Sequence, residues 1–134
     1  MKKFLVAILL LTISCKKDTY EFSGNLQVEF VSGYLDNSKS KMQLESFQLN
    51  SFYLLVAENP NFKIDIKLDY IKTDGKKRIY KTNELLCGNY YILIQGTFFD
   101  SIEYELYGNS KTTRTYYKYF QIIPSKITKI EIGL

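Results

Sequence analysis

The amino-acid sequence predicts an all-β fold, a single antiparallel β-sandwich of about seven to nine strands that spans residues 20–134. Apolar and polar residues alternate with a period of two from Tyr20 onward, and turn-forming residues interrupt this alternation roughly every 8–12 residues. No sustained helical period is present, and 134 residues are enough for one compact domain but not for two.

The first half of the chain contains two clear alternating segments. In the first segment, Phe22, Leu26, Val28 and Phe30 alternate with polar residues, which predicts a strand with one buried face. In the second, residues 62–72 lead into Asp74-Gly75 and then residues 77–82. Asp-Gly between two such segments is a strong two-residue hairpin signal, so these segments are predicted to pair antiparallel.

Other segments are apolar on both faces or less regular. The runs Phe52–Ala57 and Tyr90–Ile94, the latter within residues 89–98, suit central strands because both faces would be covered. Residues 38–50 fit a short helix about as well as a bulged strand and are treated as irregular. Further strands are predicted at residues 101–107, 114–123 and 126–134.

Residues 85–90, Leu-Leu-Cys-Gly-Asn-Tyr, form an L-x-x-G-x-Y motif before a central strand. The motif resembles the turn before a core strand in transthyretin-like and carboxypeptidase-regulatory-like domains, and residues 120–134 are similar to the final hairpin of that family. The resemblance covers residues 79–134 and implies an immunoglobulin/transthyretin-like sandwich in which Tyr90 reaches back as a tyrosine corner. It implies no particular activity, since such domains serve as adaptors, stalks and binding modules.

Residues 1–14 have the composition of an export signal, with Lys2 and Lys3 before an apolar run. The run is too short to span a membrane, which needs about 20 residues. Ser14-Cys15 resembles the lipobox of bacterial lipoproteins, although Thr12 stands where that box usually carries Leu. The resemblance implies cleavage before Cys15, acylation of Cys15 and a tether over residues 15–19. The alternative is an ordinary secretory signal that is cut elsewhere.

The start of the mature chain, Cys-Lys-Lys-Asp, is similar to lipoproteins of the Bacteroidota. The similarity implies a lipid-anchored protein of the cell envelope, at the outer membrane. Acidic residues after the lipidated Cys direct some of these proteins to the cell surface, and only Asp18 is acidic here, so periplasmic and outward-facing orientations both stay open.

The amino-acid composition limits the kinds of catalysis and metal binding that the protein can perform. The chain has no His, no Trp and two Cys, against twelve Tyr and nine Phe, which excludes most zinc, haem and His-based catalysis. We expect no cofactor and no metal. With Cys15 acylated, Cys87 is the remaining thiol, and its apolar surroundings favour a structural role in the core. Glu103 and Glu105 share one face of a predicted strand, where they most simply form the solvated side.

Three groups of residues are candidates for binding or modification. Tyr117 and Tyr119 are predicted to lie together on the outer face of strand 114–123, opposite Phe120 and Ile122. Lys76, Lys77 and Arg78, with Lys72, cluster at the hairpin tip, as either a binding surface or an ordinary solvated turn. Asp100-Ser101-Ile102 resembles the O-glycosylation sequon of Bacteroidota, which implies a glycan on Ser101.

Together these observations predict a non-enzymatic binding or structural accessory module, held at a membrane by acyl chains on Cys15. The alternatives are a protein-binding inhibitor or immunity-type lipoprotein, and a glycan-binding module that uses exposed tyrosines. Loss of Lys2 and Lys3 with the signal peptide lowers the formal net charge from +4 to +2, which argues against a nucleic-acid partner.

Overall fold

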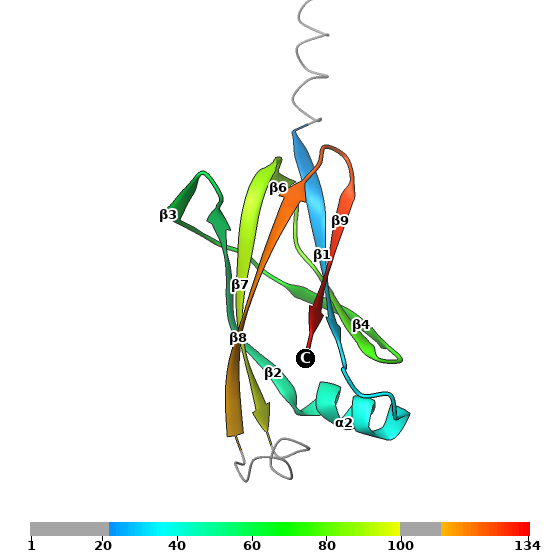
Figure 1. Cartoon of the computed structure of the whole chain (residues 1–134). Coiled ribbons are helices and arrows are strands. Elements are labelled where there is room, and N and C mark those ends of the chain that lie inside the picture. The colour runs from blue at the N-terminus through cyan, green and yellow to red at the C-terminus, as the bar shows by residue number, and fades with distance from the viewer. Residues whose placement is uncertain (1–21, 100–110) are drawn as a thin grey trace, which may run out of the picture.

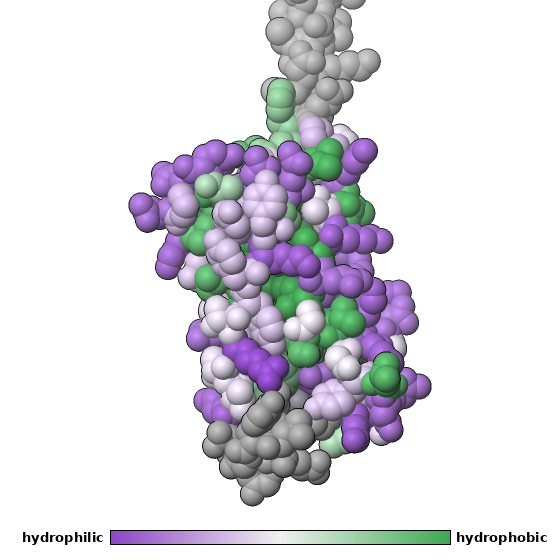
Figure 2. Space-filling model, in the orientation of Figure 1, coloured by the Kyte–Doolittle hydropathy of each residue, from purple (hydrophilic) through white to green (hydrophobic). Residues whose placement is uncertain are grey.

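The computed structural model describes residues 22–99 and 111–134, which form one helix and nine strands. The strands make two sheets (Figure 1), as predicted for an all-β chain. In the same orientation, polar side chains cover much of the surface and apolar ones gather in its middle (Figure 2). The predicted strand at residues 101–107, with Glu103 and Glu105, lies outside the described residues, as do residues 1–21.

The first sheet is built around β1. It contains β1 (Ser23–Val31), β4 (Asp69–Asp74), β5 (Lys77–Lys81), β6 (Leu85–Leu86) and β9 (Ile127–Gly133). β5 and β6 pair antiparallel with β1, whereas β9 pairs parallel with it, from Asn25 opposite Ile127 to Val31 opposite Gly133. The expectation of antiparallel pairing throughout is wrong for β9. The strand before β9 in the chain is β8, which belongs to the other sheet. β8 and β9 therefore do not pair with each other as a hairpin.

The second sheet has the order β3-β2-β7-β8 and is antiparallel throughout. Its strands are β2 (Phe47–Val56), β3 (Asn59–Asp65), β7 (Gly88–Phe99) and β8 (Lys111–Ile122). β2 and β7 each have a partner on both sides, which confirms the predicted central position of the two runs that are apolar on both faces.

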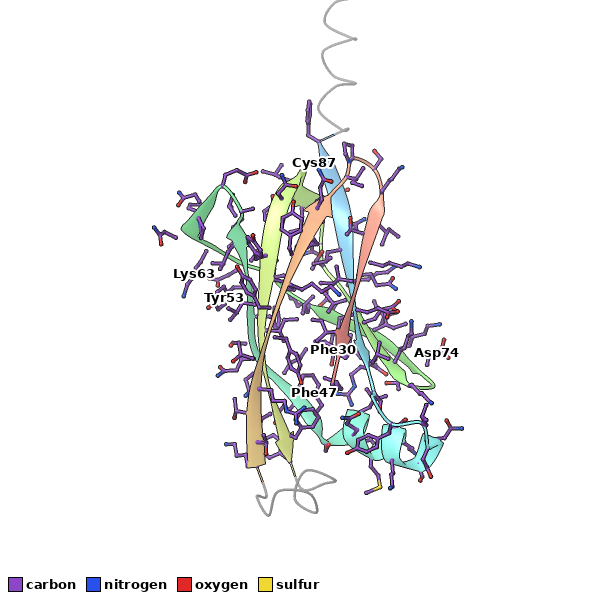
Figure 3. The ribbon with its side chains drawn as sticks, in the orientation of Figure 1. Phe30, Phe47, Tyr53, Lys63, Asp74 and Cys87 are labelled. Atoms are coloured by element: carbon purple, nitrogen blue, oxygen red, sulfur yellow. The ribbon has the colours of Figure 1, made fainter. Side chains whose placement is uncertain are left out.

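The predicted hairpin forms, but its first arm is shorter than expected. β4 and β5 pair antiparallel, with Asp74 opposite Lys77 at the tip (Figure 3). Because Asp74 pairs with Lys77, the two turn residues are Gly75 and Lys76, one position later than the predicted Asp74-Gly75. Gly75 has a positive φ of 57° at the first turn position, where type II′ turns favour glycine, and Lys76 does not have a positive φ. Residues 62–72 are not one strand, because β3 ends at Asp65 in one sheet and β4 begins at Asp69 in the other.

The physical reason for this error lies in the connecting residues. Ile64 and Ile66 pack against the hydrophobic core and Leu68 is part of it, so the apolar alternation runs unbroken through the passage from sheet to sheet. A period of two reports which residues face the core, and it does not report which sheet a residue belongs to.

Residues 38–50 contain both a helix and a strand with an irregular register. α2 (Asn37–Ser46) is a helix whose N-cap is Asp36, since Asp36 Oδ1 accepts hydrogen bonds from the backbone N–H groups of Ser38 and Lys39. β2 follows directly from Phe47, with an irregular register between Leu49 and Ser51. The segment is therefore not irregular as expected, because a helix and a strand with an irregular register follow one another within it.

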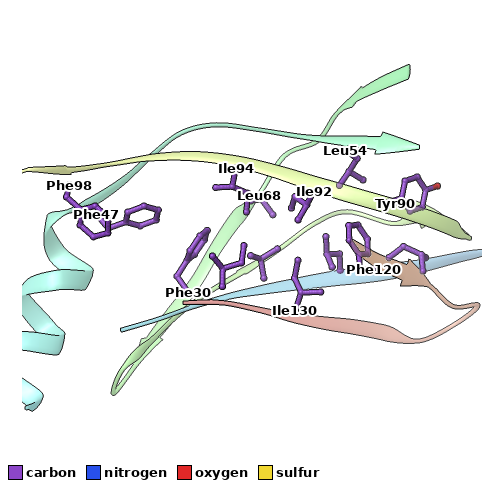
Figure 4. Packing of buried hydrophobic residues seen from close by; sticks show 14 residues of the cluster. Phe30, Phe47, Leu54, Leu68, Tyr90, Ile92, Ile94, Phe98, Phe120 and Ile130 are labelled. Atoms are coloured by element: carbon purple, nitrogen blue, oxygen red, sulfur yellow. The ribbon is translucent and has the colours of Figure 1, made fainter. Parts of the chain in front are cut away.

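The hydrophobic core lies between the two sheets (Figure 4). Phe47 lies at the end of the core near α2, with its ring centroid 5.0 Å from that of Phe30 and 5.2 Å from that of Phe98. Each fully buried side chain of this size contributes about 1.5–3 kcal/mol relative to exposure. The buried apolar residues of the strands are Leu26, Val28, Phe30, Phe47, Leu54, Ile79, Tyr90, Ile92, Ile94, Phe98, Phe120, Ile122, Ile130 and Ile132.

The alternation in β1 holds for three of its four predicted core residues, Leu26, Val28 and Phe30. Phe22 is exposed instead, because β1 begins only at Ser23 and Phe22 lies beyond the end of the sheet.

Candidate binding surface

Tyr117 and Tyr119 lie side by side on the outer face of β8, 57% and 52% exposed. On the same strand Phe120 and Ile122 are buried in the core, as the alternation predicts. β8 is an edge of its sheet and pairs only with β7 among the described strands of that sheet. The outer faces of β7 and β8 therefore form the immediate surroundings of both tyrosines.

A third tyrosine, Tyr91 of β7, completes the arrangement. Its ring stacks on Tyr117 with 4.9 Å between the centroids and 11° between the planes, and it meets Tyr119 edge to face at 5.3 Å. We call Tyr91, Tyr117 and Tyr119 the tyrosine cluster. Sequence reasoning missed Tyr91 because the run around it is apolar on both faces. The register of β7 against β8, which puts Tyr91 opposite Tyr119, is the signal that identifies it.

The same outer face continues across the sheet as a half-buried apolar strip. Leu93 lies between Tyr117 of β8 and Tyr53 of β2, and Leu55 lies beside Tyr91. At the far side the ammonium group of Lys63 lies 4.5 Å from the centroid of the Tyr53 ring, an amino–aromatic contact between β3 and β2 (Figure 3). The strip thus ends in a positive charge.

Polar side chains border the tyrosine cluster at one end. The hydroxyl of Tyr119 donates to Asn89 Oδ1 at 3.0 Å, and Asn89 Nδ2 donates to Glu58 Oε1 at 3.3 Å. This chain of hydrogen bonds holds the Tyr119 ring in one position and places a carboxylate beside the aromatic surface. The result is an apolar patch with a negative border at Glu58 and a positive one at Lys63.

Each cation of the predicted basic surface at the hairpin has a partner within the chain. Lys76 Nζ donates to the carbonyl oxygen of Leu35 at 3.0 Å. The guanidinium of Arg78 donates to the carbonyl oxygens of Phe47, at 2.8 Å, and Leu44. Arg78 therefore satisfies carbonyl groups where α2 ends and β2 begins.

Lys77 bridges two carboxylates on the outer face of the first sheet. Its Nζ lies 2.9 Å from Glu29 Oε2 and 2.7 Å from Glu131 Oε1. Hydrogen bonds to Glu131 and Glu29 raise the pKa of Lys77. The hydrogen bond from Lys77 lowers the pKa of Glu29, against the opposing effect of burial. Lys77 thus stabilises the pairing of β5, β1 and β9.

Cys87 and Lys72 are the other predicted positions that lie within the described residues. Cys87 is a free cysteine, partly buried and packed against the core, which agrees with a structural thiol (Figure 3). Lys72 is exposed and lies 3.6 Å from Asp74 Oδ2. Cys15 and Ser101 lie outside the described residues, so acylation and glycosylation stay predictions.

A concave region elsewhere in the domain is lined mainly by polar and charged side chains. A cavity of about 260 Å³ lies between the passage from β3 to β4 and the residues that precede β6, and Asp65, Lys67 and Glu84 are among its lining residues. In the described ranges, no group of three or more His, Cys, Asp or Glu residues is arranged to hold a metal ion. Within residues 22–99 and 111–134, no helix has the length and apolar character required to cross a membrane.

Neither a protein-family model nor a curated protein sequence matches the chain. A solved structure of a leucine-rich repeat protein from Bacteroides thetaiotaomicron shows a distant likeness, with 13% sequence identity and a TM-score of 0.44. The match covers 85% of this chain and 14% of that protein, so this chain spans a small part of its length. A likeness at this level identifies neither a family nor a function.

Proposed function

We propose that this chain is an exported lipoprotein, held in the cell envelope by acyl chains on Cys15, whose domain is a non-enzymatic binding or structural accessory module. The domain is proposed to be an immunoglobulin/transthyretin-like sandwich and the anchoring membrane the outer membrane. The tyrosine cluster is the proposed contact surface. The single observation that carries the binding role is the stack of Tyr91 on Tyr117 at a solvent-exposed face.

The stack matters because it fixes the rings before a partner arrives. Tyr supplies a large contact area while losing the freedom of only two side-chain torsions, and mutual stacking has already reduced that freedom. Tyr119 is held in addition by its hydrogen bond to Asn89. Fixed aromatic side chains at an exposed face are typical of residues that dominate the binding energy of protein interfaces.

A protein partner is favoured over a glycan by the ring geometry. Stacking on a sugar requires a free ring face, and Tyr91 and Tyr117 each use one of their two faces for the other, which reduces the ring-face area left for a sugar. A flat protein surface contacts ring edges and hydroxyl groups as readily as ring faces. The inhibitor or immunity-type role is the form of this proposal in which the partner is a toxin or hydrolase, and glycan binding is the alternative.

The anchor is supported by the sequence around Cys15 and by simple energetics. Each buried methylene of an acyl chain contributes about 0.8 kcal/mol, so several chains make anchoring effectively permanent. Cys15→Ala should release the protein from membranes and end acyl labelling. If the variant stays in the membrane fraction and still incorporates label, the anchor is refuted.

The contact surface is tested by crosslinking the full-length lipoprotein in envelopes and isolating its complexes. We expect a stoichiometric protein partner that is lost with Tyr117→Ala plus Tyr119→Ala and kept with Tyr70→Ala. Tyr70 is a matched control because it is also 57% exposed but lies on β4, in the other sheet.

Retention of the partner by the double variant would overturn the role of the tyrosine cluster. If the double variant instead loses only retention on envelope polysaccharide, glycan binding replaces protein binding. All variants are compared for thermal stability first, so that loss of binding is separated from loss of the fold.

A further inference from the structure

Four exposed apolar side chains surround the beginning of β1, where the N-terminal segment enters the domain. They are Phe22, Leu86, Ile123 and Ile127, with exposed fractions between 42% and 72%. We call these four residues the apolar rim. Figure 2 shows apolar side chains among polar ones at this end of the molecule, beside the start of β1.

The fold brings the apolar rim together from three separate segments. Ser23 pairs with Leu86, and the carbonyl oxygen of Phe22 accepts a hydrogen bond from the Cys87 N–H at 2.7 Å. On the other side of β1, Asn25 pairs with Ile127. β1 and its two neighbours therefore fix three of the four side chains on one end of the domain.

The turn between β8 and β9 brings in the fourth residue. The backbone of this turn packs on Gly24, where an added Cβ would overlap the carbonyl oxygens of Ile123 and Lys126. The N–H of Ser125 also donates to the carbonyl oxygen of Ser23 at 2.9 Å. Ile123 is thus held beside the start of β1 by backbone contacts, and Lys126 places a positive charge next to it.

We propose that the apolar rim rests in the interfacial region of the lipid bilayer that holds the acyl chains of Cys15. The inference rests on the proposed lipid anchor and adds an orientation to it. The occupant of this surface is lipid because of where the chain leaves the domain: the segment that joins Cys15 to the rim ends at Phe22, which is itself a member of the rim.

The length of that segment limits how far the rim can be from the membrane. Six residues, 16–21, separate Cys15 from Phe22. A fully extended chain spans at most about 3.3–3.6 Å per residue, so Phe22 lies no more than roughly 25 Å from the anchored cysteine. Apolar side chains held this close to a bilayer gain by entering its interface, which removes their surface from water.

The charges near the anchor are compatible with the same occupant. Residues 16–21 balance Lys16 and Lys17 with Asp18 and Glu21, and Lys126 lies in the turn beside the rim. Basic residues next to a membrane anchor are attracted to anionic headgroups over distances of about a Debye length. The two lysines directly after Cys15 are the ones closest to the headgroups, so the acidic residues do not oppose contact with the bilayer.

The orientation has a consequence for the rest of the domain. α2 lies at the end of the molecule opposite the start of β1 (Figure 1). With the apolar rim at the membrane, α2 and the turn before it point away from the bilayer. The tyrosine cluster, on the outer face of β7 and β8, lies along the side of the domain and stays accessible to a partner.

The test uses the full-length acylated protein in vesicles of phosphatidylethanolamine and phosphatidylglycerol. A fluorescent nitrobenzoxadiazole label is attached to one introduced thiol in a Cys87→Ser background. The rim positions are Ile127→Cys and Leu86→Cys, and the control is Met42→Cys, on the exposed side of α2. Spin-labelled lipids report contact with the bilayer, and aqueous iodide reports contact with water.

We expect labels at positions 127 and 86 to be quenched several-fold more by spin-labelled lipid than the label at position 42, and several-fold less by iodide. Equal iodide access at all three positions, in protein shown by mass spectrometry to be acylated, would overturn the orientation and leave the anchor intact. Protein without acyl chains at Cys15 would overturn the anchor and this inference with it.

Paired substitutions separate the apolar rim from the tether. Phe22→Ser plus Ile127→Ser should leave the protein in the membrane fraction but raise iodide quenching of a label at position 86. The matched control, Leu35→Ser plus Met42→Ser, changes two exposed apolar residues at the other end and should leave that quenching unchanged. Equal effects of the two pairs would contradict the proposal.

Discussion

The hydroxyl of Tyr90 donates a 2.8 Å hydrogen bond to the carbonyl oxygen of Leu86, four residues earlier in the chain. Tyr90 belongs to β7 in one sheet, and Leu86 belongs to β6, which pairs with β1 in the other. The bond therefore closes the turn at which the chain passes between the sheets, as the L-x-x-G-x-Y motif predicted. The Tyr90 ring also stacks with Phe120 at 5.7 Å, and burial raises the pKa of its hydroxyl.

Tyr90→Phe removes this hydrogen bond and keeps the stacked ring. We expect the free energy of unfolding to fall by about 0.5–1.5 kcal/mol, the usual contribution of a hydrogen bond in a protein. Urea denaturation measures the change. Tyr117→Phe is the control, because an exposed substitution should change stability by less than about 0.5 kcal/mol. Equal stability of Tyr90→Phe and the unchanged protein would contradict a structural role for the bond.

Arg78 provides a second structural prediction. Arg78→Met keeps much of the aliphatic stem but removes both hydrogen bonds to carbonyl oxygens at the junction of α2 and β2. Hydrogen bonds to charged groups contribute about 1.5–3 kcal/mol, so we expect a loss in that range by chemical denaturation. Lys72→Met, which changes an exposed lysine of the same hairpin, should have little effect. If Arg78→Met were as stable as the unchanged protein, the two hydrogen bonds of Arg78 would not contribute to the stability of the fold.

Gly96 tests the packing around Phe47. An added Cβ at Gly96 would overlap the ring of Phe47, which is buried in the core. Overpacking of this kind usually costs about 1–3 kcal/mol, which we expect for Gly96→Ala. Gly133→Ala is the matched control, since nothing lies within 4 Å of a Cβ there. Adding Phe47→Leu to Gly96→Ala should lessen the overlap, so the two changes should be less harmful together than the sum of their separate effects.

Local patterns predicted much of the fold. β8 starts three residues before its predicted first residue, and β9 starts one residue after its own. Both strands were predictable because each shows one buried face and is bounded by turn residues. The hairpin at Gly75 was also predictable from neighbouring residues, and the backward hydrogen bond of Tyr90 was expected from the resemblance of its L-x-x-G-x-Y motif to a known turn.

The features that escaped prediction depend on contacts between distant segments. Tyr91 joins the tyrosine cluster only through its register with β8, and Arg78 meets carbonyl oxygens more than thirty residues away in sequence. A single sequence carries no signal for such long-range pairings.

α2 escaped prediction for a local reason. It buries only Ser40, Gln43 and Leu44, so its apolar face is too small to produce a helical pattern.

The contact between Glu29 and Lys77 predicts how stability depends on pH. Glu29 is buried on the outer side of β1, where Lys77 and Gln27 hold its pKa below the ordinary glutamate value of 4.5. A carboxylate whose pKa is lower in the folded state stabilises that state above the ordinary pKa, and the contribution is lost as pH falls through the folded pKa. Lys77 stays charged throughout this range, since an ordinary lysine loses its proton only at about pH 10.4 and the pKa of Lys77 is raised further.

We therefore expect the free energy of unfolding to vary little from pH 7 to about pH 5 and to decline below about pH 4.5. Glu29→Gln should be less stable at pH 7 but decline less steeply in acid, so that the two curves converge. The pKa of Asp36 is lowered as well, by hydrogen bonds from Ser38 and Lys39, so part of the decline should remain in the variant. Glu45→Gln, at an exposed pair 3.8 Å from Lys41, is the control and should keep the full slope. Parallel curves for Glu29→Gln and the unchanged protein would show that Lys77 does not stabilise the ionised form of Glu29.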